Sequence, residues 1–211
     1  MRKIAVLFSG GVESSLLVWH YLNEGYVVYP FYVKCGFPWE RVEIRWSEKL
    51  WTSIKKMKPS LMTLRILPVI SSFKPKTRLP VSEADLEIPL RNMTLTLMIL
   101  LSAMGRGIKK IAIGSLGIYD FPDNRREFFD SVERILDMSG WGFKIETPFM
   151  GLDKAEVIRL AGRGFPLYKT FSCAKPFRKW HCGICAKCTE RMEGFREAGV
   201  DDRTFYFFKR S

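Results

Sequence analysis

Near its start, the chain passes from an apolar segment directly into a glycine-rich turn and then into a helical pattern. Ile4 to Phe8 is apolar at every position, as expected for a strand covered on both faces of a parallel sheet. Ser9-Gly10-Gly11 follows, and Ser14 to Asn23 reads as a helix. The unpaired N–H groups at the start of such a helix attract anions, and glycines let the backbone approach a phosphate closely. This order predicts an α/β protein with a phosphate-binding loop.

The loop is predicted to hold the pyrophosphate part of ATP. Its serine hydroxyls can add hydrogen-bond donors to those of the backbone. It lacks the Gly-Lys-Ser/Thr sequence of the P-loop and the three glycines of the dinucleotide-binding pattern. An ordinary serine-capped turn is the structural alternative. The residues assigned to ATP binding are Ser9, Gly10, Gly11, Val12, Glu13, Ser14 and Ser15.

The rest of the chain alternates strand and helix patterns, which indicates a doubly wound, mostly parallel sheet. Asp153 and Glu156 have the spacing of a capping box, and their helix is expected to run to about Arg163. The segment from Ser71 to Pro89 reads as a long loop, either a lid or a plain surface excursion. Further strands are expected at 27–33, 62–67, 110–114 and 143–147, and further helices at 39–56, 92–104 and 125–137.

Composition agrees with a folded, cytoplasmic protein. The 211 residues are 47% hydrophobic, which argues against global disorder. No signal peptide is visible, and the longest apolar stretch, around Leu95 to Met104, is shorter than the roughly 20 residues of a membrane helix. The net charge of +12 would attract nucleotides or RNA. Because the cations are spread along the whole chain, nucleic-acid binding stays open but is not indicated.

Four of the five cysteines lie close together near the C-terminus. In an intracellular chain such a cluster indicates metal ligands before disulfides. Four thiolates without a redox partner favour a structural Zn²⁺ with no open position for a reactive water. An iron–sulfur cluster and a redox disulfide are the alternatives. His181 is expected to be a hydrogen-bonding neighbour, and Cys35 a buried or half-buried thiol. The predicted ligands are Cys173, Cys182, Cys185 and Cys188.

Together, the loop and the cysteine cluster resemble the 7-cyano-7-deazaguanine synthase family of the ATP pyrophosphatase superfamily. The loop is similar to the Ser-Gly-Gly-x-Asp-Ser signature of that superfamily. The resemblance covers nearly the whole chain in order, and the cysteine block and the Pro-Asp-x-Arg block are specific to the family. The segments that carry it are Pro89–Asn92, Pro122–Phe128, Leu152–Glu156, Thr170–Cys173, Cys182–Cys188, Arg191, Gly194-Phe195 and Ala198-Gly199.

The resemblance implies an adenine nucleotide alpha hydrolase-like domain at residues 1–168 and a zinc-binding knuckle with a helical segment at 169–211. It also implies a reaction for queuosine or archaeosine synthesis in tRNA. ATP, accompanied by Mg²⁺, adenylates 7-carboxy-7-deazaguanine, ammonia gives an amide, and a second activation gives the nitrile. A cationic, water-poor site suits this chemistry because negative charge develops on phosphate.

The same resemblance suggests which residues act in this reaction. Arg91 and Lys154 are the candidate catalytic cations, and surface cations are the plain alternative. Asp123, Arg125 and Glu40 are the candidate substrate-binding residues, because a carboxylate can accept the N–H groups of a guanine-like ring. For Asp123, a cap on the following helix is the alternative role.

Three departures from the family pattern keep other functions open. Glu13 stands where Asp is usual, Asn124 stands where Cys is frequent, and Lys34-Cys35-Gly36 replaces a Gln-Arg-His segment. A paralogue that passes the activated group to another nucleophile, such as a protein amine, therefore stays open. So do a non-catalytic nucleotide- or RNA-binding protein and a tRNA thiolation enzyme. The oligomeric state is also open, with a homodimer among the options.

Overall fold

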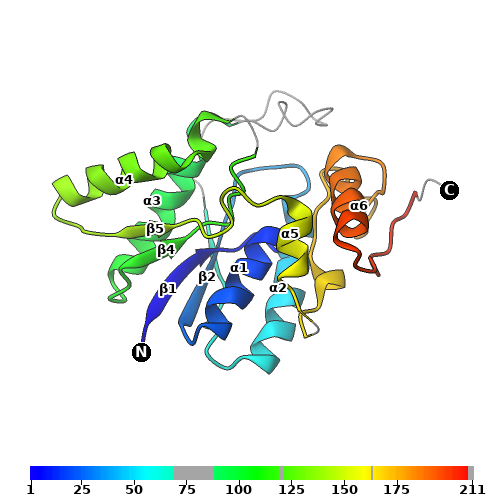
Figure 1. The fold of residues 1–211 in the computed structure, drawn as a ribbon, viewed down its shortest axis with the longest axis horizontal. Coiled ribbons are helices and arrows are strands. Elements are labelled where there is room, and N and C mark those ends of the chain that lie inside the picture. The colour runs from blue at the N-terminus through cyan, green and yellow to red at the C-terminus, as the bar shows by residue number, and fades with distance from the viewer. Residues whose placement is uncertain (69–87, 119–120, 163, 209–211) are drawn as a thin grey trace.

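The computed structural model describes residues 1–68, 88–118, 121–162 and 164–208. Five parallel strands form one sheet in the order β3-β2-β1-β4-β5, with helices on both faces (Figure 1). The predicted doubly wound α/β fold is confirmed. The strands are β1 (Lys3–Leu7), β2 (Val27–Val33), β3 (Arg65–Leu67), β4 (Lys110–Ala112) and β5 (Lys144–Glu146). The helices are α1 (Val12–Asn23), α2 (Glu40–Met57), α3 (Arg91–Met104), α4 (Arg126–Met138), α5 (Lys154–Arg159) and α6 (Ala186–Ala198), with 3-10 turns η2 (Pro122–Asn124) and η3 (Leu167–Lys169).

Strand β1 shows why both faces of the sheet are covered. Its Ile4 and Val6 lie in a core with α1, α2 and α5, whereas Ala5 lies in the opposite core with α3 and α4. Successive side chains of a strand point to opposite faces, so a strand that is apolar throughout needs helices on both. Because β1 lies between β2 and β4, the strand order reverses beside it. Open α/β sheets bind ligands at such a reversal.

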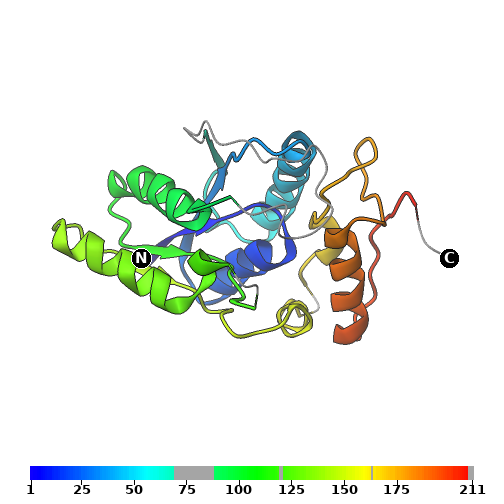
Figure 2. The same ribbon diagram turned by 90° about the horizontal axis from the view of Figure 1, so that it is seen from above.

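The C-terminal segment lies beside α5. Helix α6 packs against α5, and in both ribbon views it is remote from α4 (Figures 1 and 2). The buried guanidinium of Arg191 in α6 donates to Thr170 at 2.7 Å, to the carbonyl of Leu167 at 3.2 Å and to Thr204 at 2.8 Å. A buried charge needs such partners. Arg191 therefore ties α6 to the segments before and after the cysteine cluster.

One predicted helix is shorter than expected, and one predicted loop cannot be compared. The capping box of Asp153 and Glu156 is present, with both reciprocal hydrogen bonds formed. However, α5 ends at Arg159 rather than near Arg163. The N–H groups that follow bond three residues back, and Gly162 has a φ of +62°, so the last turn tightens and stops. The expected loop at 71–89 lies almost entirely outside the described residues.

Within the described ranges, no helix combines the length and the apolar character that a membrane crossing requires.

Candidate active site

A cavity of about 310 Å³ opens at the carboxyl edge of the sheet. Its wall includes residues directly after β1, β2 and β4, among them Ser9, Cys35 and Gly114. Its volume falls in the range of small-molecule sites, roughly 300–1,000 Å³. It also lies where open parallel sheets bind their ligands. The cavity is therefore the candidate active site.

The cavity wall brings together most of the residues predicted for ATP binding, catalysis and substrate binding. Two of the others, Val12 and Ser15, are fully buried inside the fold. Arg125 is exposed at the N-cap of α4. The predicted residues that line the cavity are Ser9, Gly11, Glu13, Ser14, Glu40, Arg91, Asp123 and Lys154. The residues predicted for ATP or substrate that lie outside its wall are Gly10, Val12, Ser15 and Arg125.

The two glycines of the loop meet different constraints. Gly10 has a φ of +80°, and a Cβ there would lie 2.4 Å from Oγ of Ser47 in α2. Gly11 has a φ of −66°, and its Cβ would lie 3.4 Å from Oγ of Ser9 and 3.7 Å from a carboxylate oxygen of Glu13. The turn and the approach of α2 therefore require Gly10. A side chain at position 11 would instead occupy space beside two residues of the cavity wall.

The polar groups of the loop bond to one another across the turn. Oγ of Ser14 accepts the N–H of Ser9 at 3.2 Å and lies 3.1 Å from Oγ of Ser9. The N–H of Gly11 donates to Oγ of Ser9 at 3.3 Å. These distances are at the long end of the range for hydrogen bonds. Donors held so weakly can turn to an incoming anion at small cost.

Lys154 lies between two carboxylates beside the loop. Its Nζ is 2.7 Å from Oε1 of Glu13 and 2.8 Å from Oε1 of Glu190. Burial alone would lower the pKa of Lys154, but the two carboxylates outweigh burial and raise it above its ordinary value. Burial alone would raise the pKa of Glu13, but the Lys154 ammonium holds it below its ordinary value. Both groups therefore stay charged next to the glycine loop.

Helix α6 makes room for Lys154 through a glycine. A Cβ on Gly194 would lie 2.7 Å from Cγ and 3.0 Å from Cδ of Lys154. The alkyl chain of Lys154 therefore passes directly over Gly194 on its way to Glu13. The same helix contributes Lys187 and Glu190 to the cavity wall. Sequence reasoning missed both of these residues, because their approach to the loop depends on how α6 packs.

The first turn of α2 places two carboxylates in the wall. Oε1 of Glu40 accepts the N–H groups of Cys35 at 2.5 Å and Gly36 at 3.2 Å, which orders the turn after β2. Glu43 accepts the O–H of Tyr32 at 2.5 Å, and burial raises the pKa of Glu43. Sequence reasoning missed Glu43. Its helical spacing of three residues from Glu40 was the available signal.

Asp123 is bound to the start of α3 and does not cap α4. Its carboxylate oxygens accept the backbone N–H of Asn92 at 2.8 Å and the side-chain amide at 3.2 Å. This satisfies an N–H in the first turn of α3, whose N-cap Leu90 supplies no side-chain acceptor. The N-cap of the following helix is Arg125. The alternative role expected for Asp123, a cap on the following helix, is therefore wrong.

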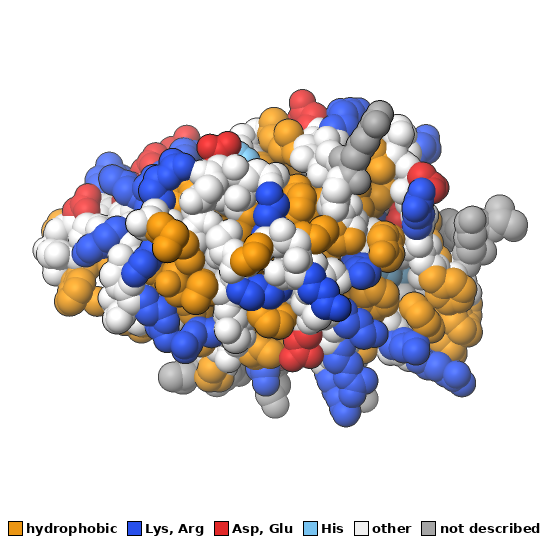
Figure 3. Space-filling model, turned by 90° about the horizontal axis from the view of Figure 1, so that it is seen from below, with side chains coloured by type: hydrophobic (Ala, Val, Ile, Leu, Met, Phe, Trp, Pro, Cys, Tyr) orange, Lys and Arg blue, Asp and Glu red, His pale blue; other side chains and the backbone are white. Residues whose placement is uncertain are grey.

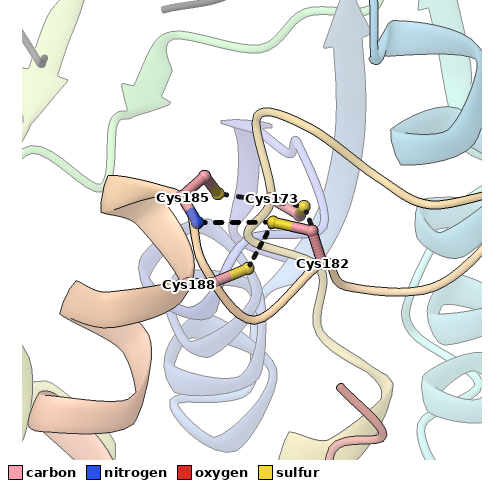
Figure 4. Close-up of side chains that lie close together, drawn as sticks. All are labelled: Cys173, Cys182, Cys185 and Cys188. Atoms are coloured by element: carbon pink, nitrogen blue, oxygen red, sulfur yellow. Dashed lines mark hydrogen bonds between the residues drawn. The ribbon is translucent and has the colours of Figure 1, made fainter. Parts of the chain in front are cut away.

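The four clustered cysteines converge on one point (Figure 4). All four sulfur atoms lie within 4.8 Å of one another, and the pairs Cys182–Cys188 and Cys173–Cys185 are 3.9 Å apart. A tetrahedral ion with Zn–S bonds of about 2.3 Å spaces its sulfurs about 3.8 Å apart. Three backbone N–H groups also point at these sulfurs from 3.3 to 3.4 Å, which stabilises thiolate charge. The cluster could therefore hold one metal ion.

His181 and Cys35 lie outside this ligand set. Burial lowers the pKa of His181 to about 3, and its neutral ring accepts the N–H of Ser172 at 3.0 Å. The prediction of a hydrogen-bonding neighbour is confirmed. Cys35 is half-buried and lines the cavity, and burial raises the pKa of its thiol to about 11.

The parallel sheet and the glycine loop beside its order reversal define a doubly wound α/β fold of the adenine nucleotide alpha hydrolase-like class. A solved structure described as a 4-thiouridine synthetase–RNA complex with bound ATP shares this fold. The two superpose with a TM-score of 0.54 at 17% identity, over 94% of this chain and 50% of that one. The family model described as "Queuosine biosynthesis protein QueC" matches residues 3–199. The chain belongs to the QueC family, as the sequence resemblance predicted.

Curated relatives match the chain over nearly its full length. The 7-cyano-7-deazaguanine synthase of Stutzerimonas stutzeri (strain A1501) is 30% identical over 98% of this chain and 99% of that protein. The 7-cyano-7-deazaguanine synthase 2 of Desulfitobacterium hafniense (strain Y51) is 30% identical over 98% of this chain and 94% of that protein. Both relatives are named as 7-cyano-7-deazaguanine synthases, which is the family that the sequence resemblance predicted.

Proposed function

We propose that this chain is an ATP-dependent ligase that converts 7-carboxy-7-deazaguanine and ammonia to 7-cyano-7-deazaguanine. The observation that carries the proposal is the cavity in which the glycine loop, Lys154 and Asp123 share one wall, in a chain of the QueC family. The substrate carboxylate attacks the α-phosphate of ATP, and pyrophosphate leaves. Ammonia then displaces AMP to form an amide. A second ATP activates the amide oxygen, and loss of AMP and a proton gives the nitrile.

In this reaction, the phosphate loop and Lys154 bind and orient the pyrophosphate. The ammonium of Lys154 offsets charge that develops on the leaving oxygens, and Arg91 is a second cation in the same wall. Glu13 and Glu190 keep Lys154 charged and aimed at the loop. Glu13 is also the candidate ligand for Mg²⁺, which proteins bind through one or two carboxylates together with substrate phosphates. A bound Mg²⁺ would neutralise phosphate charge.

Alanine at Gly194 is expected to lower ATP cleavage by about 10- to 100-fold, because a shift of about 1 Å in a catalytic group can cost two orders of magnitude. Pyrophosphate release measures the rate, and a melting curve measures stability. The loss of stability from crowding Lys154 is partly offset, because alanine is more favourable than glycine in a helix by about 1 kcal/mol. Gly105→Ala is the matched control, since Gly105 has a φ of −67° and open space around an added Cβ. Unchanged cleavage in folded Gly194→Ala would contradict the role of Lys154.

Asparagine at Asp123 is expected to weaken binding of the deazapurine acid at least tenfold, or about 1.4 kcal/mol. The carboxylate accepts the ring N–H groups, and an amide replaces one acceptor with a donor. The affinity for ATP should change by less than about twofold, or roughly 0.4 kcal/mol. Calorimetric titration with each ligand, beside a melting curve, separates the roles. Reduced stability with unchanged acid affinity would show that Asp123 serves only its contact with Asn92.

We also propose that residues 169–211 form a metal-dependent unit around one structural Zn²⁺. Four protein thiolates would occupy all four coordination positions of a tetrahedral ion. The metal would therefore hold this segment together and carry no reactive water. The short spacing of the sulfurs favours a single ion, because an iron–sulfur cluster inserts several atoms between its thiolates.

The reaction is tested by incubating the protein with ATP, Mg²⁺, ammonium and 7-carboxy-7-deazaguanine and identifying the products by mass spectrometry. We expect the nitrile together with AMP. A second candidate is a paralogue that transfers the activated acid to another nucleophile, such as a protein amine. Cys35 belongs to the segment that departs from the family pattern, and its position in the cavity wall, together with that of Phe37, favours this candidate. An adenylate or amide that goes no further would support this candidate, and absence of any ATP turnover would contradict both.

A further inference from the structure

A second groove, of about 490 Å³, lies between α2, η3 and the C-terminal segment. It shares no lining residue with the candidate active site, so the proposed ligase reaction does not account for it. Its described lining consists of four aromatic side chains, three cations and Thr52, and it includes no carboxylate. The four rings are those of Trp46, Tyr168, Trp180 and Phe205.

Three of these rings form a connected set, and two of the four are well exposed. The ring centroids of Trp46 and Trp180 are 6.0 Å apart, and those of Trp180 and Phe205 are 5.2 Å apart, both edge-to-face. The indole N–H of Trp46 donates to the carbonyl of Lys179 at 2.7 Å, which fixes that ring. Tyr168 is 46% exposed and Phe205 is 56% exposed. The aromatic surface that the groove exposes is therefore that of Tyr168 and Phe205, whereas Trp46 is half-buried and held in place.

Three cations line the groove, and two of them, Lys49 and Lys169, lie over ring faces. Nζ of Lys49 is 5.4 Å from the Trp46 centroid, and Nζ of Lys169 is 5.6 Å from the Tyr168 centroid. The side chain of Arg203 is 76% exposed and that of Asp201 is 79% exposed. Nε of Arg203 lies 3.2 Å from Oδ2 of Asp201. An ion pair this exposed contributes little. The guanidinium of Arg203 can therefore turn to an incoming phosphate.

We infer that this groove binds single-stranded nucleic acid, with unpaired bases stacked on the exposed rings of Tyr168 and Phe205 and phosphates beside the cations. Aromatic platforms combined with a positive track are the two elements of sequence-tolerant single-strand binding. An acidic peptide would satisfy the cations but leave the ring faces unused, and a duplex hides its base faces in the stack. The net charge of +12 adds long-range attraction. Figure 3 shows a face on which Lys and Arg side chains intersperse with hydrophobic ones and acidic groups are few.

The test is fluorescence anisotropy of the full chain with a labelled oligouridine of about 12 nucleotides, a length within the usual site sizes. We expect salt-dependent binding of this RNA and of oligothymidine, since neither rings nor cations read a 2′-hydroxyl. A duplex of the same length should bind at least tenfold more weakly. Phe205→Ala is expected to weaken single-strand binding about tenfold, in line with the loss of one stacked base. Arg203→Ala should also flatten the slope of log affinity against log salt by about 0.7, the value for one phosphate.

Two matched variants separate the groove from general surface effects. Arg196 is 75% exposed and lies 3.4 Å from Glu197, so Arg196→Ala removes an equivalent cation outside the groove. Phe207 is 41% exposed in the same segment as Phe205 but does not line the groove. Both controls should bind like the unaltered protein. Equal affinity for duplex and single strands, equal losses in variants and controls, or stronger competition by an acidic peptide than by the oligonucleotide would each overturn the inference.

Discussion

Alanine in place of Gly11 is expected to abolish ATP cleavage while leaving the free energy of unfolding nearly unchanged. Gly11 has a φ of −66°, which alanine adopts without strain, and its added Cβ would make only ordinary contacts, the closest at 3.4 Å. The methyl group would stand beside Ser9 and Glu13, where the proposed pyrophosphate must lie. Misplacing a bound reactant by about 1 Å can cost 100-fold in rate, and we expect at least that loss. Pyrophosphate release and urea denaturation measure the two quantities.

Gly10→Ala is the matched comparison, because its effect should fall on stability first. A left-handed φ costs a non-glycine residue about 1–2 kcal/mol, and the Cβ would lie 2.4 Å from Oγ of Ser47. We therefore expect a clearly lower free energy of unfolding for Gly10→Ala than for Gly11→Ala. ATP cleavage by Gly11→Ala at close to the normal rate would show that the loop does not hold phosphate.

Serine in place of Cys188 is expected to release the bound metal and to lower the free energy of unfolding by several kcal/mol. Cys188 is fully buried in the first turn of α6. For a structural site, metal binding contributes directly to folding, with about 10–16 kcal/mol in zinc-finger peptides. Loss of the metal should also loosen α6, which contributes Lys187 and Glu190 to the wall of the candidate active site. ATP cleavage should therefore fall together with stability.

Elemental analysis of the purified protein should find one zinc per chain before the substitution and almost none after it. Amide hydrogen exchange across residues 186–198 should speed up in Cys188→Ser. Cys35→Ser is the control, because this cysteine lies outside the cluster and its loss should leave the metal content unchanged. Iron in the purified protein, or a folded protein without metal, would contradict the proposed site.

Features set by neighbouring residues could be predicted from the sequence. The strand at 27–33 was predicted with the boundaries that the structure shows. The capping box of Asp153 and Glu156 and the four converging cysteines were also predicted. Periodicity, helix caps and ligand spacing are local patterns, because they depend on residues a few positions apart. The fold class followed from their order, since alternating strands and helices can bury their apolar faces only in a layered sheet.

Contacts between distant segments were decided only by the tertiary structure. The nearness of Glu190 and Gly194 to Lys154 depends on how α6 packs on α5. The contact of Asp123 with Asn92 likewise joins two separate segments. Neither contact can be predicted from the local sequence pattern, because helix packing, and not spacing along the chain, brings these residues together.

The sequence by itself therefore determined the fold class, the position of the glycine loop after the first strand and the cysteine set. Which charges surround that loop was settled when the helices packed around it.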